Sequence, residues 1–184
     1  MNLHATKTDN AHIESKIHLR QLATKGLKEL RVLDCFAGEN KLWESFDKKR
    51  YFGIEKVKGK GNNLYQDNLR VIKSLDLSQF NVIDLDSYGI PANQIVELYN
   101  NATLKRGSTV IIYTCITSKM SGLNKTILKM FNMQKMYKKS KVLLNAHAKE
   151  LFYAMLYNYG VKKVYEYSIE ENSYKKTYGY FKVE

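Results

Sequence analysis

Several residue types are scarce in this chain of 184 residues, and each scarcity argues against a class of protein. Only two cysteines occur, Cys35 and Cys115, each inside an apolar run, which argues against a disulfide scaffold and a zinc site. No stretch approaches the roughly 18 apolar residues of a membrane span, and the first 20 residues contain no signal-peptide core. The protein is therefore expected in the cytoplasm. With one proline and no flexible linker, the sequence also predicts a single domain over residues 1–184.

Acidic residues are also few, since 18 Asp and Glu stand against 30 Lys and Arg, for a formal net charge of +12. This excess favours a polyanionic partner, nucleic acid before an anionic membrane surface, although codon bias is an alternative explanation. One segment is rich in lysine and lacks acids, and its lysines are Lys119, Lys125, Lys129, Lys135, Lys138, Lys139 and Lys141. It indicates either a phosphate-binding flap or a solvated helix face that packs through its interleaved methionines.

Apolar runs of strand length alternate with segments of helical spacing along most of the chain. Strands are predicted at residues 30–36, 50–54, 63–66, 80–85 and 108–114, and helices at 11–28, 40–47, 68–75, 92–101 and 145–159. Two further β-rich runs, 161–169 and 174–183, predict a C-terminal hairpin. The alternation predicts an α/β protein with a parallel sheet covered on both faces. Residues 1–29 are then an N-terminal helical extension, and residues 118–144 a basic insertion before the last helix.

Acidic residues end three predicted strands, at the edge where α/β sheets bind their ligands. Asp34 precedes a tight turn in which Gly38 allows close backbone approach and Asn40 tolerates a positive φ. Glu55 ends the second strand, about where Rossmann-type sites place a ribose-binding carboxylate, and Asp67 ends the third. Each feature alone is explained by a turn or a helix cap, so their order along the chain is the informative observation.

The segments VLDCFAG (32–38), Ile54-Glu55 and Gln66-Asp67-Asn68, in this order, resemble the cofactor half of class I S-adenosylmethionine-dependent methyltransferases. The resemblance implies a Rossmann-like sandwich with a seven-stranded, mostly parallel sheet and a C-terminal antiparallel hairpin. It also implies S-adenosylmethionine as cofactor, with Gly38 at its methionyl part, Glu55 at the ribose and Asp67 at the adenine. The implied cofactor-binding residues are Asp34, Phe36, Ala37, Gly38, Asn40, Glu55, Asp67 and Asn68. The chain departs from the family at Asn40, where a second glycine is usual, and lacks the helix between strands two and three.

The segment NVIDLDSYGIP (81–91) follows the fourth predicted strand, where amino-methylating enzymes carry their catalytic loop. It resembles the Asp-Pro-Phe-Gly-Ser-Pro motif of the tRNA guanine-N2 dimethyltransferase family at Asp86, Gly89 and Pro91, with Tyr88 in place of Phe. It resembles more loosely the Asp-Pro-Pro-Tyr loop of DNA and RNA amino-methyltransferases. Ser87 stands where both motifs carry proline.

This resemblance implies methyl transfer to an exocyclic base amine, in RNA more than in DNA. Asp86 would orient the amine and take up its proton, and Tyr88 would stack on the base. Asp84 is a competing catalytic candidate, because alternate residues of a strand face the same side. The structural alternative is that Asp84 and Asp86 cap the following helix and that Tyr88 fills core.

Other functions find less support in the sequence. The G-x-G-x-x-G fingerprint of NAD-binding sites is absent, a P-loop fails on spacing, and the four histidines have no partner at metal-ligand spacing, so no metal is predicted. Two alternatives stay open. Ser87 and Asn40 allow a non-catalytic methyltransferase-like module that binds nucleic acid or a partner, and the fold also suits a small-molecule methyltransferase.

Overall fold

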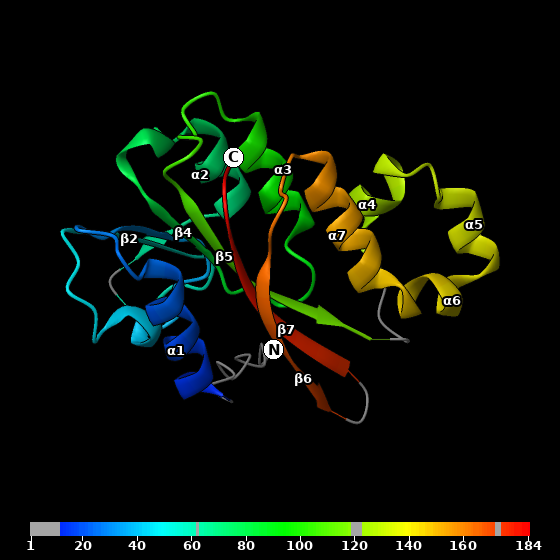
Figure 1. The fold of residues 1–184 in the computed structure, drawn as a ribbon, viewed down its shortest axis with the longest axis horizontal. Coiled ribbons are helices and arrows are strands. Elements are labelled where there is room, and N and C mark those ends of the chain that lie inside the picture. The colour runs from blue at the N-terminus through cyan, green and yellow to red at the C-terminus, as the bar shows by residue number, and fades with distance from the viewer. Residues whose placement is uncertain (1–11, 62, 119–122, 172–173) are drawn as a thin grey trace.

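The computed structural model describes residues 12–61, 63–118, 123–171 and 174–184, and its centre is one seven-stranded sheet (Figure 1). The strand order is β3-β2-β1-β4-β5-β7-β6. The strands are β1 (Arg31–Asp34), β2 (Arg50–Glu55), β3 (Leu64–Tyr65), β4 (Val82–Leu85), β5 (Val110–Thr117), β6 (Tyr165–Glu171) and β7 (Tyr174–Lys182). The first five pair in parallel, whereas β7 runs antiparallel to both β5 and β6. The predicted sheet and its C-terminal antiparallel hairpin are confirmed.

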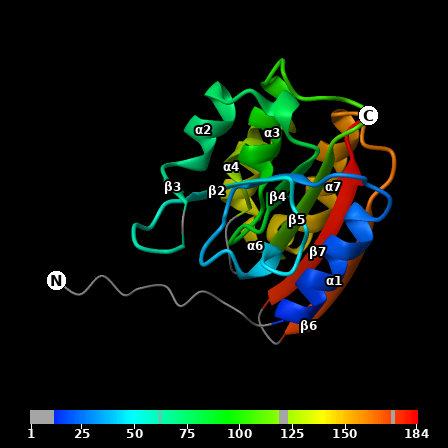
Figure 2. The ribbon, with the colours of Figure 1, turned by 90° about the vertical axis from the view of Figure 1, so that its left-hand side faces the viewer.

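Helices cover both faces of the sheet (Figure 2). One face carries α1 (Ile13–Thr24) and the short 3-10 helix η1 (Lys41–Trp43). The opposite face carries α2 (Asn68–Ser74), α3 (Ala92–Asn100) and α7 (Ala148–Asn158), with the 3-10 helix η2 (Leu77–Gln79) between α2 and β4. The basic segment forms three short helices beside α7, on the right of Figure 1, which are α4 (Lys125–Met130), α5 (Gln134–Lys139) and α6 (Lys141–Ala146).

The apolar runs of the sequence form the core because the central strands are buried on both sides. All four residues of β4 and the first six of β5 are buried, as expected for parallel strands between two layers of helices. Cys35 and Cys115 are free thiols within the larger apolar cluster, which confirms their role as small hydrophobes. Within the described part of the chain, no helix is long and apolar enough to cross a membrane.

The helix predicted over residues 40–47 is wrong, since only the single 3-10 turn η1 forms there. Asn40 adopts the left-handed conformation with φ 66°, and Trp43 inserts between α1 and the sheet with 1% of its surface exposed. The Lys48 ammonium contacts the carbonyl oxygens of Trp43 and Phe46, which a continuing helix would have used internally. Burial of one large side chain therefore overrides a moderate helical pattern.

The remaining boundaries shift by a few residues. The helix predicted at 145–159 is α6 and α7, separated at His147, and β6 begins at Tyr165 instead of residue 161. The parallel strands run so that their carboxyl ends meet at one edge, which places the ends of β1, β2 and β4 next to one another.

Candidate active site

Two cavities open at the carboxyl edge of the sheet, and Phe36 and Glu55 line both of them. The smaller, called here the β2-side cavity, has a volume of about 240 Å³ and is lined at the ends of β1 and β2 and the start of α2. The larger, called the β4-side cavity, has a volume of about 540 Å³ and is lined by residues of the β4 loop, α1, β5 and β7. A ligand that extends past Glu55 would therefore reach both.

Glu55 is held in place by the glycine turn that follows β1. Its Oε2 accepts a hydrogen bond from the Gly38 amide at 3.0 Å, and its Oε1 accepts one from the Val57 amide at 2.9 Å. Gly38 has a φ of 52°, in the left-handed region that glycine adopts without strain. Because a carboxylate offers about four acceptor positions, Glu55 retains capacity for the hydroxyl groups of a ligand.

The loop after β2 closes against this turn. Asn63 donates through Nδ2 to the carbonyl oxygens of Gly38 and Lys60, at 2.9 and 2.8 Å. Its Oδ1 lies against the position that a Cβ would take at Gly53, so any other residue at that point of β2 would force Asn63 to shift. The described residues between β2 and β3, 56–61 and 63, form no helix, and Val57 and Lys60 among them line the β4-side cavity.

Asp67, for which the resemblance implies an adenine contact, and its neighbour Asn68 both line the β2-side cavity. Asp67 caps α2, because its Oδ1 accepts from the Leu69 amide at 2.9 Å. Asn68 links the end of β1 to α3, because its Nδ2 donates to the Cys35 carbonyl oxygen and its Oδ1 accepts from Gln94. Apolar Phe36, Ile54 and Leu69 also line this cavity.

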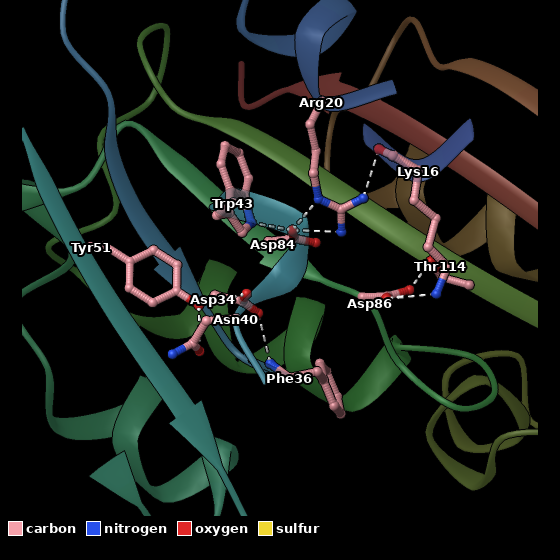
Figure 3. A network of polar contacts seen from close by, with 10 residues as sticks. All are labelled: Lys16, Arg20, Asp34, Phe36, Asn40, Trp43, Tyr51, Asp84, Asp86 and Thr114. Atoms are coloured by element: carbon pink, nitrogen blue, oxygen red, sulfur yellow. Dashed lines mark hydrogen bonds and ion pairs between the residues drawn. The ribbon is translucent and has the colours of Figure 1, made fainter. Parts of the chain in front are cut away.

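Three other predicted cofactor residues, Asp34, Ala37 and Asn40, support the turn and line neither cavity. Asp34 is 2% exposed, accepts from the Phe36 amide at 3.1 Å and lies 3.0 Å from the Tyr51 hydroxyl, which also contacts Asn40 (Figure 3). Burial, and then the neighbouring Asp84 carboxylate, raise the pKa of Asp34 to about 8. Asp34 is therefore a neutral buried group across most of the acid and neutral range.

The two catalytic candidates at the end of β4 differ sharply in accessibility. Asp84 is fully buried, and its Oδ2 lies 2.7 Å from Arg20 Nε, from Arg20 Nη2 and from Trp43 Nε1 (Figure 3). Asp86 lies two residues further, on the wall of the β4-side cavity, with Lys16 Nζ 2.8 Å from Oδ2 and Thr114 Oγ1 2.5 Å from Oδ1. A substrate in this cavity meets Asp86 and not Asp84.

The charge state of Asp86 follows from its neighbours. Burial by itself raises the pKa of this carboxyl, but the positive charges of Arg20 and then Lys16, with hydrogen bonds from Lys16 and Thr114, hold it below its ordinary value. Asp86 is therefore ionised at neutral pH and accepts hydrogen bonds.

The structural alternative for this loop is wrong. The N-cap of α3 is Pro91, without a side-chain cap, so neither Asp84 nor Asp86 caps the helix. Tyr88 is 89% exposed and lines the β4-side cavity as well as a third cavity of about 380 Å³ beside Asn124 and Ala148. Ser87 donates to the carbonyl oxygens of Thr114 and Gly89, at 2.9 and 3.2 Å, and so fixes the loop where the related motifs carry proline.

Six of the seven predicted phosphate-binding lysines lie on α4, α5 and α6 or at their ends, and all six are exposed: Lys125, Lys129, Lys135, Lys138, Lys139 and Lys141. Lys119 lies outside the described residues. Met130 and Met133 pack against the core, whereas Met136 is 52% exposed. This arrangement suits both a nucleic-acid surface and a solvated helix face.

Sequence reasoning missed the contribution of α1. The sequence predicts the helix but assigns Lys16 and Arg20 only to an N-terminal extension, whereas both side chains reach the end of β4 in the structure. The available signal was their spacing of four residues, which puts two cations on one face of a helix that also carries apolar residues. Trp43 was likewise missed, since a lone tryptophan in a short polar segment has no distinctive pattern.

Neither a family model nor a curated protein matches the sequence. Solved structures with the same fold include the N-terminal domain of EvdMO1 with SAH bound, with a TM-score of 0.56 and 8% identity over 94% of this chain and 81% of that one. The methyltransferase domain of bacterial CtHen1 gives a TM-score of 0.51 and 11% identity over 93% and 100%. The Escherichia coli protein yhhF, a candidate methyltransferase, gives 0.50 and 11% over 92% and 87%. The chain therefore has a Rossmann-like methyltransferase fold.

Proposed function

We propose that this protein is an S-adenosylmethionine-dependent methyltransferase that modifies an exocyclic amine of a nucleic-acid base, in RNA before DNA. The observation that carries the proposal is the pair of cavities joined at Phe36 and Glu55. One presents carboxylates and apolar walls suited to a nucleoside, and the other presents an ionised carboxylate and an exposed tyrosine. A fold shared with a domain that binds SAH, the product of S-adenosylmethionine, supports this reading.

The residues of the β2-side cavity fit the cofactor. Glu55, already oriented by two backbone amides, would accept from the ribose hydroxyls, and Asp67 would accept from the adenine amino group. Gly38 would lie against the methionyl part, at the boundary with the β4-side cavity. The bound cofactor supplies an electrophilic methyl group, and the chain supplies the position from which an acceptor reaches it.

The residues of the β4-side cavity fit an amine acceptor. An exocyclic amine conjugated to its ring is a weak nucleophile, and an ionised carboxylate orients it and takes up its proton. Asp86 is ionised, lines the cavity and keeps acceptor capacity beyond its contacts with Lys16 and Thr114. The exposed ring of Tyr88 offers the acceptor base a stacking surface, worth about 1 to 3 kcal/mol per base in single-strand binders.

The substrate class rests on charge. With a net charge of +12 and six exposed lysines on the helices that follow β5, the protein suits a substrate with a phosphate backbone. The lysines would hold the backbone, and the β4-side cavity would select the base.

Calorimetric titration with S-adenosylmethionine, followed by transfer of a labelled methyl group to tRNA, single-stranded RNA and DNA, tests the proposal. Glu55→Ala should weaken cofactor binding by about 1 to 3 kcal/mol, because a charged acceptor is lost. The matched control is Glu44→Ala, an exposed glutamate outside both cavities. No binding at millimolar cofactor would leave a non-catalytic module, and transfer only to small amines would leave a small-molecule enzyme.

Charge reversal tests the nucleic-acid surface separately. Replacing Lys135, Lys138, Lys139 and Lys141 by glutamate should weaken RNA binding and flatten its salt dependence, because the phosphate contacts are lost. Cofactor affinity should stay unchanged. The control variant reverses the same number of exposed lysines elsewhere, Lys25, Lys28, Lys105 and Lys182. Equal effects of the two variants would show that only net charge matters and that α5 and α6 form no specific surface.

A further inference from the structure

Helix α1 brings two cations to the end of β4 at a spacing that matches the strand (Figure 3). Arg20 contacts Asp84, and Lys16, one helical turn earlier, contacts Asp86. Four residues of helix advance about 6 Å, and two residues of strand about 6.6 Å, so the two pairs form side by side. The helix thus places one cation over each carboxylate, in the opposite chain order.

Arg20 anchors this arrangement. Its guanidinium is 1% exposed, binds Asp84 through Nε and Nη2, and donates through Nη1 to the carbonyl oxygen of Lys16 at 2.8 Å. Trp43 binds the same Asp84 oxygen from the other side. The backbone of α1 at Lys16 is therefore fixed relative to β4.

Lys16 acts at the cavity, not in the core. The Lys16 and Asp86 side chains are 11% and 12% exposed, and both line the β4-side cavity. Lys16 Nζ occupies one oxygen of Asp86, and Thr114 Oγ1 occupies the other. These two contacts fix the plane of the carboxylate, while each oxygen keeps acceptor capacity for a substrate N–H.

We propose that Lys16 is a positioning residue for methyl transfer, which keeps Asp86 ionised and aimed into the β4-side cavity through this ion pair. The role rests on the proposed function. Burial raises the pKa of the Asp86 carboxyl and the Lys16 charge lowers it, so removal of that charge would let the pKa rise. Among the described residues, the charged or titratable groups around Asp86 come from α1 (Lys16, Arg20), β4 (Asp84), β6 (Tyr167) and β7 (Lys176, Tyr178), and Glu55, Lys60 and Tyr88 line the same cavity.

The first test is the pH dependence of transfer by Lys16→Met, which keeps the length of the side chain without its charge. Transfer should fall roughly tenfold to a hundredfold at pH 6, because the carboxylate loses its orientation and part of its charge. The loss should shrink as pH rises and Asp86 ionises again. Lys16→Arg should restore most of the rate, and Lys25→Met, the same change at an exposed position of α1's end, should have no effect. Thermal denaturation checks that each variant is folded, with Lys16→Gln as a substitute for Lys16→Met.

The second test needs no cofactor. Carbon-13 NMR of the Asp86 carboxyl in the cofactor-free protein should show a higher pKa in Lys16→Met than in wild type and Lys25→Met. An unchanged titration, or a uniform loss of transfer at every pH without rescue by Lys16→Arg, would overturn the role of Lys16 while leaving the proposed function intact. Wild-type protein that binds cofactor but transfers no methyl group would overturn the proposed function and this role together.

Discussion

The two faces of the sheet bury different chemistry at the same level of the same strands. Ile83 and Leu85 of β4 join the large apolar cluster under α2, α3 and α7, whereas Val82 and Asp84 face α1. Alternation along a strand makes this division possible within four residues. The α1 face carries the charged groups Asp84 and Arg20 next to the β4-side cavity, and the opposite face buries no comparable ion pair among the described residues.

The two faces differ in what stabilises them. Apolar burial stabilises the α3 face in any protonation state, because no charge is involved. The α1 face depends on pairing, since a buried charge that loses its partner costs several kcal/mol. The β4-side cavity therefore adjoins the face whose stability is sensitive to pH and to single charges, whereas the β2-side cavity is lined by residues of α2 and α3 from the opposite face.

Arg20→Met should have the largest effect. Removing the cation leaves Asp84 buried and uncompensated, which should destabilise the fold by about 3 to 5 kcal/mol at pH 7.5. The carboxyl of Asp84 then takes up a proton more readily in the folded state than in the unfolded state, so the deficit should be smaller at pH 5. Denaturation by guanidinium at both pH values measures it. An equal deficit at both pH values would mean that packing, and not charge, is what α1 contributes.

Asp86→Asn should separate function from stability on the same face. The shape is retained but the negative charge is lost, so methyl transfer should fall by about a hundredfold or more. The Lys16 and Asp86 side chains are only 11% and 12% exposed, so loss of the pair should also cost stability, but less than Arg20→Met, which leaves a fully buried charge without its cation. Methyl transfer and stability are measured for Asp84→Asn in parallel, and that variant should lose more stability than Asp86→Asn. Full activity of Asp86→Asn would assign the acceptor role elsewhere.

Ile95→Val probes the opposite face. Ile95 is fully buried on α3, and loss of one methyl group should cost about 0.5 to 1.5 kcal/mol. This cost should be the same at pH 5 and pH 7.5, because no titratable group changes. A pH-dependent deficit would show that the two faces are coupled through β4, and the comparison between them would fail.

Asp34→Asn should mainly change the slope of stability against pH, with little change below about pH 4, where the carboxyl is protonated in both the folded and the unfolded state. Since the pKa of Asp34 is raised to about 8 in the folded protein, the folded state holds a proton that the unfolded state releases above about pH 4. Asp34 therefore lowers wild-type stability as pH rises between about 4 and 8. The variant should remove that contribution, so its stability should fall less over this range. Parallel slopes for the two proteins would contradict a neutral Asp34.

Much of the arrangement was predictable because it depends on local patterns. Continuous apolar runs predicted the central strands, and acidic residues at strand ends predicted Asp34, Glu55 and Asp67 at one edge. Glu55 and Asp67 line cavities there, as does Asp86 from the motif after β4, whereas Asp34 is buried and lines neither cavity. The absence of a helix at residues 40–47 could not be predicted from local patterns. A 3-10 turn replaces it because Trp43 is buried against Asp84, which lies 41 residues away in the sequence.

The sequence by itself determined the parallel sheet, its terminal hairpin and the edge that carries the site, because strand periodicity and turn chemistry act over a few residues. Only the tertiary structure distinguished the surroundings of Asp84 from those of Asp86, two residues that are equivalent in the sequence pattern. The reason is that α1 covers Asp84 completely and leaves Asp86 at a cavity wall. The residue of α1 that contacts Asp84 is Arg20, which lies 64 residues earlier in the chain. Such a choice depends on which helix packs over which strand, and no local pattern records it.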